Sequence, residues 1–382
     1  MTSRQRVRTA LDHREPDRVP FDLGSTRVTG ITVGAYRGLR QALGLPPAEI
    51  AIADPKQGLA QVEEPVLQRL GADLRGVMPG PPSGFEPSLE EDGDYLRYHD
   101  EWGIAWRTPR DRGLYYDMSY HPLAGVEDMA ALKAFPWPDA ADPGRYRRLR
   151  EQAEQAAATG AAVVLGGACS GILEQAAWLM GFADFYAGLA AQPDLVFGVV
   201  DRVLEFKMAY WERALALVGD LVDVVMEADD LGFQETLMMS PQTYRRHLKP
   251  RHTRLFAHIK RQAPVRMFFH SCGAVRQILP DLIEAGVDIL NPVQVNAAGM
   301  DTAALKREFG EALTFWGGGV DTQHVLPHGT PEMVRDEVKR RIEDLAPGGG
   351  FVFNTVHNIQ ADVPAANILA MWEALREYGT YA

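Results

Sequence analysis

The chain has 382 residues, a length within the range of one α/β barrel with insertions. Hydrophobic residues make up 46% and charged residues 24%, values of an ordinary globular protein, which excludes a disordered chain. The 39 Lys and Arg against 51 Asp and Glu give a net charge of -12, which argues against an extended surface for nucleic acid or anionic membranes.

Two cysteines, Cys169 and Cys272, are too few for a disulfide scaffold. The first residues lack the apolar core of a signal peptide, so we expect the protein to work in the reducing cytoplasm. The most apolar stretches run far short of the roughly 20 residues that a membrane helix needs, so no membrane span is expected.

Short β-rich runs alternate with helix-like segments along most of the chain, which is typical of repeated βα units around a parallel sheet. Two of the helix-like segments begin with an N-cap followed by proline, at Ser240-Pro241 and Thr330-Pro331. The expected strands lie at 18–24, 71–79, 161–168, 221–230, 264–272, 286–294, 313–321 and 350–358. Eight strands predict a (β/α)8 (TIM) barrel with an N-terminal extension, and we expect residues 1–382 to form one such domain.

Residues 81–146 interrupt this pattern with a stretch rich in Pro, Gly, Trp and Tyr. We interpret the stretch as an insertion of antiparallel hairpins near the barrel mouth. Its aromatic part, 102–120, is expected beside the mouth or at a subunit contact, because Trp and Tyr are favoured where one end of the side chain is buried among apolar groups and the other end contacts solvent. An ordinary hairpin packed on the side of the barrel is the alternative.

Polar residues end the expected strands, and in a barrel the C-terminal strand ends converge on one face. These residues are therefore the first candidates for a functional site. In chain order they are Glu227, Asp229, Asp230, His270, Cys272, Asn291, Gln294, Asp321, Gln323, Asn354, His357 and Asn358.

His270 and Cys272 lie two residues apart, so in an extended strand they project to the same side and could share an ion. His357 is well placed as a third ligand, since a closed barrel brings the last strand near the one that carries His270. Imidazole and thiolate suit Zn²⁺, and three protein ligands leave a fourth position for substrate or for Glu227. In the alternative interpretation, His270 bonds to a backbone carbonyl and Cys272 is a small buried hydrophobe.

Three carboxyl groups, those of Glu227, Asp229 and Asp230, fall within four residues. Because like charges repel, we expect one of three outcomes: one of the carboxyl groups is protonated, one pairs with a cation, or the side chains point away from one another. A metal ligand or a substrate clamp is one interpretation, and N-capping with loop hydrogen bonding is the other. Cys169, by contrast, is expected to pack at a strand end.

Five stretches together make the chain resemble the uroporphyrinogen decarboxylase superfamily over nearly its whole length. They are "DRVPFDLGSTRVTGI", "DEWGIAWRTP", "DDLGFQETLMMSPQTYRRHLKPRHTRL", "FFHSCGAVRQILPDLIEAGVDILNPVQ" and "GGGFVFNTVHNIQADVPAANI". The resemblance implies a (β/α)8 barrel and one of two chemistries. One is the cofactor-free decarboxylation of a tetrapyrrole, and the other is zinc-dependent methyl transfer to or from a corrinoid on a partner protein. The resemblance also leads us to expect that the protein could form a homodimer.

The decarboxylase branch carries an Arg-rich stretch, approximately R-Q-A-G-R-Y, that orders the carboxylates of its substrate. Here the corresponding stretch is "FDLGSTRVTG", with Arg27 as its only basic residue, so this branch is the alternative. The methyltransferase branch has H-x-C on one strand, matched by His270 and Cys272, and a Cys on the last strand, where this chain has His357. A neutral imidazole in place of a thiolate makes the metal a stronger Lewis acid, which suits the oxygen of a methyl ether.

The leading hypothesis is therefore a zinc methyltransferase that moves a methyl group from an O-methylated, or an N- or S-methylated, small molecule to a corrinoid protein. In it, Zn²⁺ at His270, Cys272 and His357 polarises the leaving atom, and Asp230 belongs to the catalytic group. The residues expected to orient the substrate are Arg27, Asp229, Gln234, Asn291, Gln294 and Asn354. A cofactor-free decarboxylase, and a barrel that binds a ligand without turnover, are the alternatives.

Overall fold

The computed structural model describes residues 1–110 and 115–381. Its centre is a seven-stranded parallel sheet with the order β13-β12-β11-β10-β9-β8-β3. The strands are β3 (Leu74–Val77), β8 (Ala162–Gly166), β9 (Val224–Ala228), β10 (Arg266–His270), β11 (Ile289–Asn291), β12 (Thr314–Trp316) and β13 (Phe351–Val352). Each of the expected strands from residue 71 onward contains one of them, so these seven strand predictions are confirmed.

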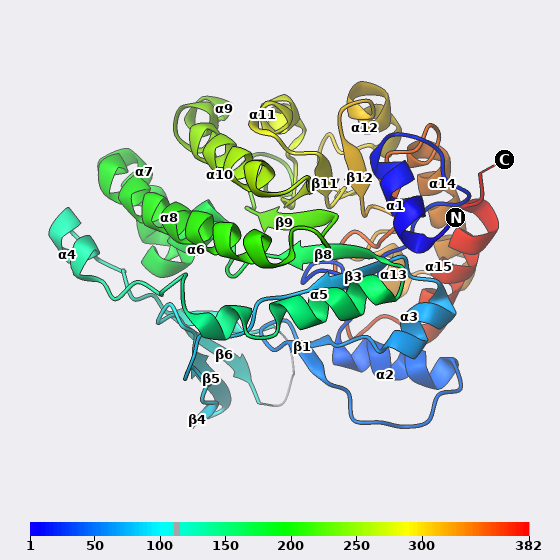
Figure 1. Cartoon of the computed structure of the whole chain (residues 1–382), viewed down its shortest axis with the longest axis horizontal. Coiled ribbons are helices and arrows are strands. Elements are labelled where there is room, and N and C mark those ends of the chain that lie inside the picture. The colour runs from blue at the N-terminus through cyan, green and yellow to red at the C-terminus, as the bar shows by residue number, and fades with distance from the viewer. Residues whose placement is uncertain (111–114, 382) are drawn as a thin grey trace.

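Residues around Phe21 occupy the eighth position and close the barrel. The N–H of Asp22 donates to Phe353 O (3.0 Å) just after β13, and the N–H of Asp73, just before β3, donates to Phe21 O (2.8 Å). The expected strand at 18–24 forms isolated bridges here, such as Phe21 to Phe353, because Pro20 has no N–H with which to extend a ladder. With both edges of the sheet joined, the predicted (β/α)8 fold is confirmed (Figure 1).

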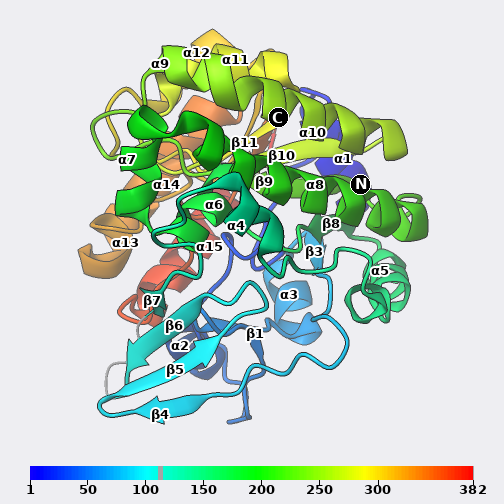
Figure 2. The same ribbon diagram turned by 90° about the vertical axis from the view of Figure 1, so that its left-hand side faces the viewer.

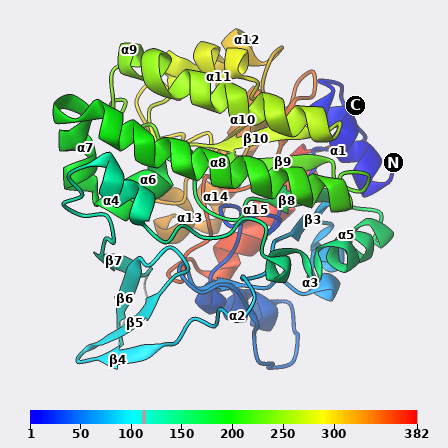
Figure 3. The same ribbon diagram turned by 60° about the vertical axis from the view of Figure 1, so that its left-hand side comes forward.

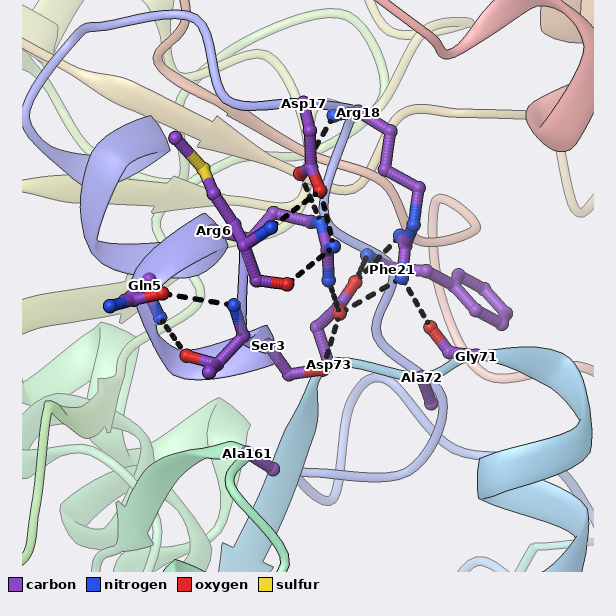
Figure 4. Close-up of polar contacts among 12 residues, drawn as sticks. Ser3, Gln5, Arg6, Asp17, Arg18, Phe21, Gly71, Ala72, Asp73 and Ala161 are labelled. Atoms are coloured by element: carbon purple, nitrogen blue, oxygen red, sulfur yellow. Dashed lines mark hydrogen bonds and ion pairs between the residues drawn. The ribbon is translucent and has the colours of Figure 1, made fainter.

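Asp73 ties the N-terminal helix α1 (Ser3–Leu11) to the base of the barrel. Its fully buried carboxyl accepts hydrogen bonds from Arg6 (2.6 Å), Arg18 (2.8 Å), Ser3 Oγ (2.8 Å) and the N–H of Phe21 (2.9 Å) (Figure 4). Two guanidinium groups and two neutral donors offset the cost of burying this carboxyl. The cluster lies at the N-terminal end of β3, on the face of a barrel that serves stability rather than chemistry.

Alternate side chains of the strands fill the barrel interior. Phe268 and Trp316 meet edge to face there, with ring centroids 5.2 Å apart, and Val7 and Leu11 of α1 pack in the same cluster. The other strand residues of this cluster are Leu74, Ala162, Val164, Val224, Ile289 and Val352. Since side chains alternate along a strand, the inward position of Phe268 also turns His270 toward the barrel axis.

Helices surround the sheet and contribute most of the second, larger core. They are α2 (Val33–Ala42), α3 (Glu64–Leu70), α4 (Met129–Ala134), α5 (Leu149–Ala158), α6 (Ile172–Met180), α7 (Phe182–Ala191), α8 (Pro193–Val218), α9 (Pro241–Thr243), α10 (Lys249–Gln262), α11 (Leu279–Ala285), α12 (Thr302–Phe309), α13 (Val325–His328), α14 (Pro331–Leu345) and α15 (Ala365–Tyr378). The longest, α8, runs beside α10 on the outside of the barrel (Figure 3). Within the described ranges, none of these helices combines the length and apolarity that crossing a membrane requires.

The insertion at 81–146 contains an antiparallel sheet that lies at one end of the molecule (Figure 2). Its strands are β4 (Glu90–Asp92), β5 (Tyr95–His99), β6 (Ala105–Pro109) and β7 (Asp117–Tyr120), and the hairpin of β1 (Ile52–Asp54) and β2 (Leu59–Ala60) precedes it. Residues 111–114 of the aromatic segment lie outside the described residues. Trp106 of β6 meets Trp178 of α6 edge to face, with centroids 5.2 Å apart, so the inserted sheet packs on the helix that follows β8.

Candidate metal centre

His270 is the last residue of β10 and is only 5% exposed. Its Nδ1 lies 2.6 Å from Asn291 Oδ1, at the end of the neighbouring strand β11. The amide of Asn291 is oriented by its other end, because Nδ2 donates to Trp316 O at 2.8 Å. Asn291 therefore presents an acceptor, so the His270 proton belongs on Nδ1 and Nε2 is left free as a ligand atom.

Cys272 lies in the turn after β10, with its Sγ 3.4 Å from His270 Nε2. Its N–H donates to Asp230 Oδ1 at 2.8 Å. The next residue, Gly273, has φ +88°, and a Cβ there would lie 2.4 Å from the backbone of Gly232. Only glycine fits this close approach, so the turn that aims Cys272 at His270 depends on it.

His357 reaches the same place from the loop that follows β13. Its ring centroid lies 5.4 Å from that of His270, and the ligand atoms of His270, Cys272 and His357 all lie within 4.8 Å of one another. The three side chains that the sequence grouped as metal ligands are thus brought together. Burial lowers the pKa of His357 to about 3 and also lowers the pKa of His270, so both imidazoles are neutral at physiological pH and can ligate.

This donor set fits a zinc ion. Imidazole nitrogen and thiolate sulfur are both usual ligands of Zn²⁺, and three protein ligands leave a position open. Burial and the nearby Asp230 raise the pKa of the Cys272 thiol well above its usual range. Because a bound divalent cation favours the thiolate, metal binding would release this proton.

The three clustered acids point to different places, as one of the sequence interpretations allowed. Glu227 pairs with Lys207 (Oε2 to Nζ 3.0 Å) and accepts from Trp211 Nε1 (2.5 Å). Glu227, the alternative to substrate as a fourth ligand, does not belong to the group of ligand atoms that lie within 4.8 Å of one another, and a buried lysine compensates its charge. Asp229 is fully buried and accepts from the N–H groups of Leu173 (2.9 Å) and Glu174 (2.8 Å), which open α6. It caps a helix and is not available to orient substrate.

Asp230 is the acid of this cluster that faces the candidate metal ligands. Its Oδ1 lies 3.9 Å from His270 Nε2 in addition to accepting from the N–H of Cys272. Asp230 also lines a cavity, together with His270 and His357. Of the three acids, Glu227 and Asp230 both line the cavity, but only Asp230 lies beside the candidate metal ligands.

Three amide residues that we expected to orient substrate, Gln234, Gln294 and Asn354, have hydrogen bonds to the loops. Gln294 donates to Gln234 Oε1 (2.9 Å) and accepts from the N–H of Gly273 (2.7 Å), and Gln234 donates to Asn296 O (2.5 Å). These bonds join the turns after β9, β10 and β11. Asn354 donates to Asp22 O (3.0 Å) and Thr29 O (3.3 Å) near the closing segment. The physical reason is that strand-end amides are drawn into the backbone bonding of the turns.

A cavity of about 470 Å³ lies beside the metal ligands, and Arg27 is one of its lining residues. Its aromatic lining comes mainly from the insertion and from α6 and comprises Phe85, Tyr98, Trp102, Trp106, Tyr115, Tyr116 and Trp178. Three buried polar atoms among its lining residues have no hydrogen-bond partner within the described structure: Tyr98 Oη, Gln175 Nε2 and Glu227 Oε2, the last of which is ion-paired with Lys207. The cavity thus combines an aromatic wall with polar atoms that a ligand could engage.

Glu174 is a cavity residue that the sequence reasoning missed. It stands in the first turn of α6, accepts a hydrogen bond from Ser170 Oγ, and lines the cavity with Gln175 and Trp178 of the same helix. Burial, then the charge of Asp230, raises its pKa to about 8. The signal in the sequence is the pair Glu174 and Gln175 within the apolar segment "GILEQAAWLM".

Comparison with known proteins finds similarity to one protein family and to its members. The profile of the uroporphyrinogen decarboxylase (URO-D) family matches residues 117–378. Uroporphyrinogen decarboxylase of Alkalilimnicola ehrlichii is 24% identical over 391 residues, which cover 97% of this chain and 93% of that protein. The enzyme of the same name from Pelobacter propionicus is 24% identical over 196 residues, and the match spans about half of it, 53%.

Among solved structures, a methyltransferase from Methanosarcina mazei has the same fold. It matches with a TM-score of 0.66 over 99% of both chains, at 18% sequence identity. A likeness at this identity concerns the architecture and leaves the chemistry to the side chains of the site.

Proposed function

This chain belongs to the uroporphyrinogen decarboxylase family, and we propose that it is a zinc-dependent methyltransferase of that family. It moves a methyl group from an O-methylated small molecule, or an N- or S-methylated one, to a corrinoid carried by a partner protein. The observation that carries this proposal is the convergence of His270, Cys272 and His357 beside a cavity. A cofactor-free decarboxylation would call on His357 as a proton donor but does not require a cysteine and a second histidine beside it.

The charge of the cavity favours methyl transfer over decarboxylation of a polycarboxylated tetrapyrrole. Its described lining includes two cations, Arg27 and Lys56, which pair with Asp54 (3.5 Å) and Asp100 (3.2 Å). The acidic lining residues are six: Asp54, Asp100, Glu101, Glu174, Glu227 and Asp230. Lys207 compensates Glu227, Arg145 pairs with Glu101, and the pKa of Glu174 is raised to about 8. Because both lining cations are already paired as well, a polyanionic substrate would find no free cation among the described lining residues, whereas a neutral methyl donor needs none.

A zinc ion bound here supplies a Lewis acid that polarises the heteroatom of the methyl donor. The residues of the chain prepare the site for it. Asn291 keeps Nε2 of His270 free of its proton, and Asp230 holds the backbone of Cys272. The aromatic side chains around the cavity exclude water and offer flat apolar surface to the body of the donor.

Metal content and methyl transfer test the proposal together. Protein purified without chelator should contain about one zinc per chain, measured by elemental analysis. Incubation with free Co(I) cobalamin and a panel of alkyl and aryl methyl ethers should produce methylcobalamin, followed by its absorbance. If the protein neither contains nor takes up a transition metal, or if it releases CO₂ from uroporphyrinogen instead, the proposal is wrong.

A further inference from the structure

Glu174 has a fixed backbone at the cavity. Its N–H and that of Leu173 both donate to Asp229 Oδ1, and Asp229 Oδ2 lies 2.7 Å from His252 Nε2. Asp229 and His252 are each about 1% exposed or less, so the hydrogen bonds that hold the first turn of α6 are excluded from solvent. The first turn of α6 therefore cannot move Glu174 out of the cavity wall without breaking a buried network.

The groups around Glu174 favour its neutral form. Burial and the like charges of Asp230 and Asp229 raise the pKa of Glu174, and they outweigh the hydrogen bond that Ser170 donates to Oε2, which by itself favours the ionised form. The nearest cation, Lys207, is held by Glu227 (3.0 Å) and by Ser170 O (2.7 Å). Among the ion pairs of the described residues, none includes Glu174. A carboxyl that is desolvated, close to other acids and without its own cation keeps its proton at neutral pH.

The cavity brings Glu174 and the metal ligands to one substrate. Glu174, Asp230, His270 and His357 all line it, from α6, the loop after β9, β10 and the loop after β13 respectively. Because Ser170 donates to Oε2, Oε1 is the oxygen of Glu174 that is left to carry a proton. A methyl donor whose heteroatom sits at the metal site is thus within the same enclosure as a protonated carboxyl.

We propose that Glu174 is the acid that protonates the leaving oxygen of the methyl donor, an inference that rests on the proposed methyltransferase function. The methyl carbon bonds to Co(I) of the corrinoid through the electron pair of the metal, which is formally oxidised to Co(III). The C–O bond breaks and its pair stays on oxygen. The proton of Glu174 moves to that oxygen, so that the product leaves as an alcohol or phenol, and the Glu174 carboxylate is reprotonated by water.

General acid catalysis by a positioned side chain contributes about 10²–10⁴-fold to a rate. The contribution depends on how poor the leaving group is, since an oxygen that is stable as an anion needs no proton. The test therefore compares Glu174→Gln with the wild-type protein on two substrates. For an electron-rich aryl or alkyl methyl ether we expect a loss of about 10²-fold or more, and for a nitro-substituted aryl methyl ether a much smaller loss.

The matched control is Glu212→Gln, the same substitution at an exposed position of α8. It should leave both rates unchanged. Glu174→Gln should also keep the zinc content of the wild-type protein, because Glu174 is not among the candidate metal ligands. An equal loss of rate on both substrates, or no loss on either, would overturn the assignment of Glu174 as the acid.

A second measurement does not depend on turnover. In purified protein with ¹³C-labelled glutamate, one side-chain carboxyl should remain protonated at neutral pH and titrate near pH 8, and its signal should vanish in Glu174→Gln. If the wild-type protein transfers no methyl group from any ether, the proposed function fails. If it does transfer methyl groups and Glu174 proves ionised at neutral pH, the inference alone fails.

Discussion

Asn291 Oδ1 lies 2.6 Å from His270 Nδ1, across the parallel pair β10 and β11 in which the two residues are direct partners. The other end of the same amide is held by Trp316 O on β12. Three adjacent strands thus decide which nitrogen of one histidine is available to a metal. A hydrogen bond of this kind orients the ring and raises the basicity of the ligating nitrogen.

Replacing Asn291 by Ala removes this support without touching a ligand. We expect zinc affinity to fall about 10–100-fold, the effect usual for partners of metal-bound histidine. Competition with a chromogenic chelator measures it. Unfolding should be recorded in parallel, because a variant with wild-type zinc affinity would show that His270 is oriented by packing alone.

Cys272→Ala should abolish stoichiometric zinc binding while the barrel still folds, because it removes the one ligand that becomes anionic. Cys169→Ala is the matched control for metal content. Cys169 lies beside Lys207 (Sγ to Nζ 3.8 Å) and is not in the metal group, so that variant should keep about one zinc per chain. Elemental analysis of both variants checks the prediction, and retention of zinc by Cys272→Ala would contradict it.

Gly273→Ala should disturb the turn that places Cys272. The substitution combines a left-handed backbone with a Cβ 2.4 Å from Gly232, and we expect about 1–3 kcal/mol of lost stability together with weaker zinc binding. Gly44 has a similar φ of +69° and open space around it, so Gly44→Ala isolates the backbone strain from the close contact. Zinc affinity should fall in Gly273→Ala and stay unchanged in Gly44→Ala.

The stability of the protein should depend on pH through Glu174. Its pKa is raised from 4.5 to about 8 in the folded protein, so its contribution is fully present below pH 4.5 and is lost progressively as the pH rises from 4.5 to 8. Glu174→Gln cannot ionise. The stability of the wild-type protein relative to this variant should therefore fall between about pH 4.5 and 8, by about 1.4 kcal/mol per pH unit, and level off above pH 8, measured by urea unfolding at about pH 5, 7 and 9. A constant difference between the two proteins would contradict the raised pKa.

Asp73→Asn should destabilise the barrel without changing its metal site. It leaves Arg6 and Arg18 without their shared buried carboxyl, which costs about 3–5 kcal/mol when one partner of a buried pair is removed. Asp12 also pairs with two arginines, at 3.2 Å and 2.7 Å, but on the surface. Asp12→Asn should cost less than about 1 kcal/mol, and both variants should bind zinc as the wild-type protein does.

The strand order and the pairing of His270 with Cys272 follow from local sequence. Apolar runs of strand length, separated by helical segments, predict a parallel barrel, and a spacing of two residues puts both side chains on one side of β10. Closure of the barrel then brings His357, in the loop after the last strand, near His270 and Cys272. The closing segment around Phe21 could not be foreseen in its detail, because Pro20 removes a donor and leaves bridges in place of a strand.

The sequence by itself determined the fold class, the polar strand ends and the three candidate ligands, because those depend on periodicity and on topology that all such barrels share. Only the tertiary structure decided which of Glu227, Asp229 and Asp230 meets the site, since that depends on Lys207 and on the first turn of α6. It also decided that burial and the charge of Asp230 raise the pKa of Glu174. The pKa of a carboxyl is set by desolvation and by charges that arrive from distant parts of the chain, and no spacing within one segment records them.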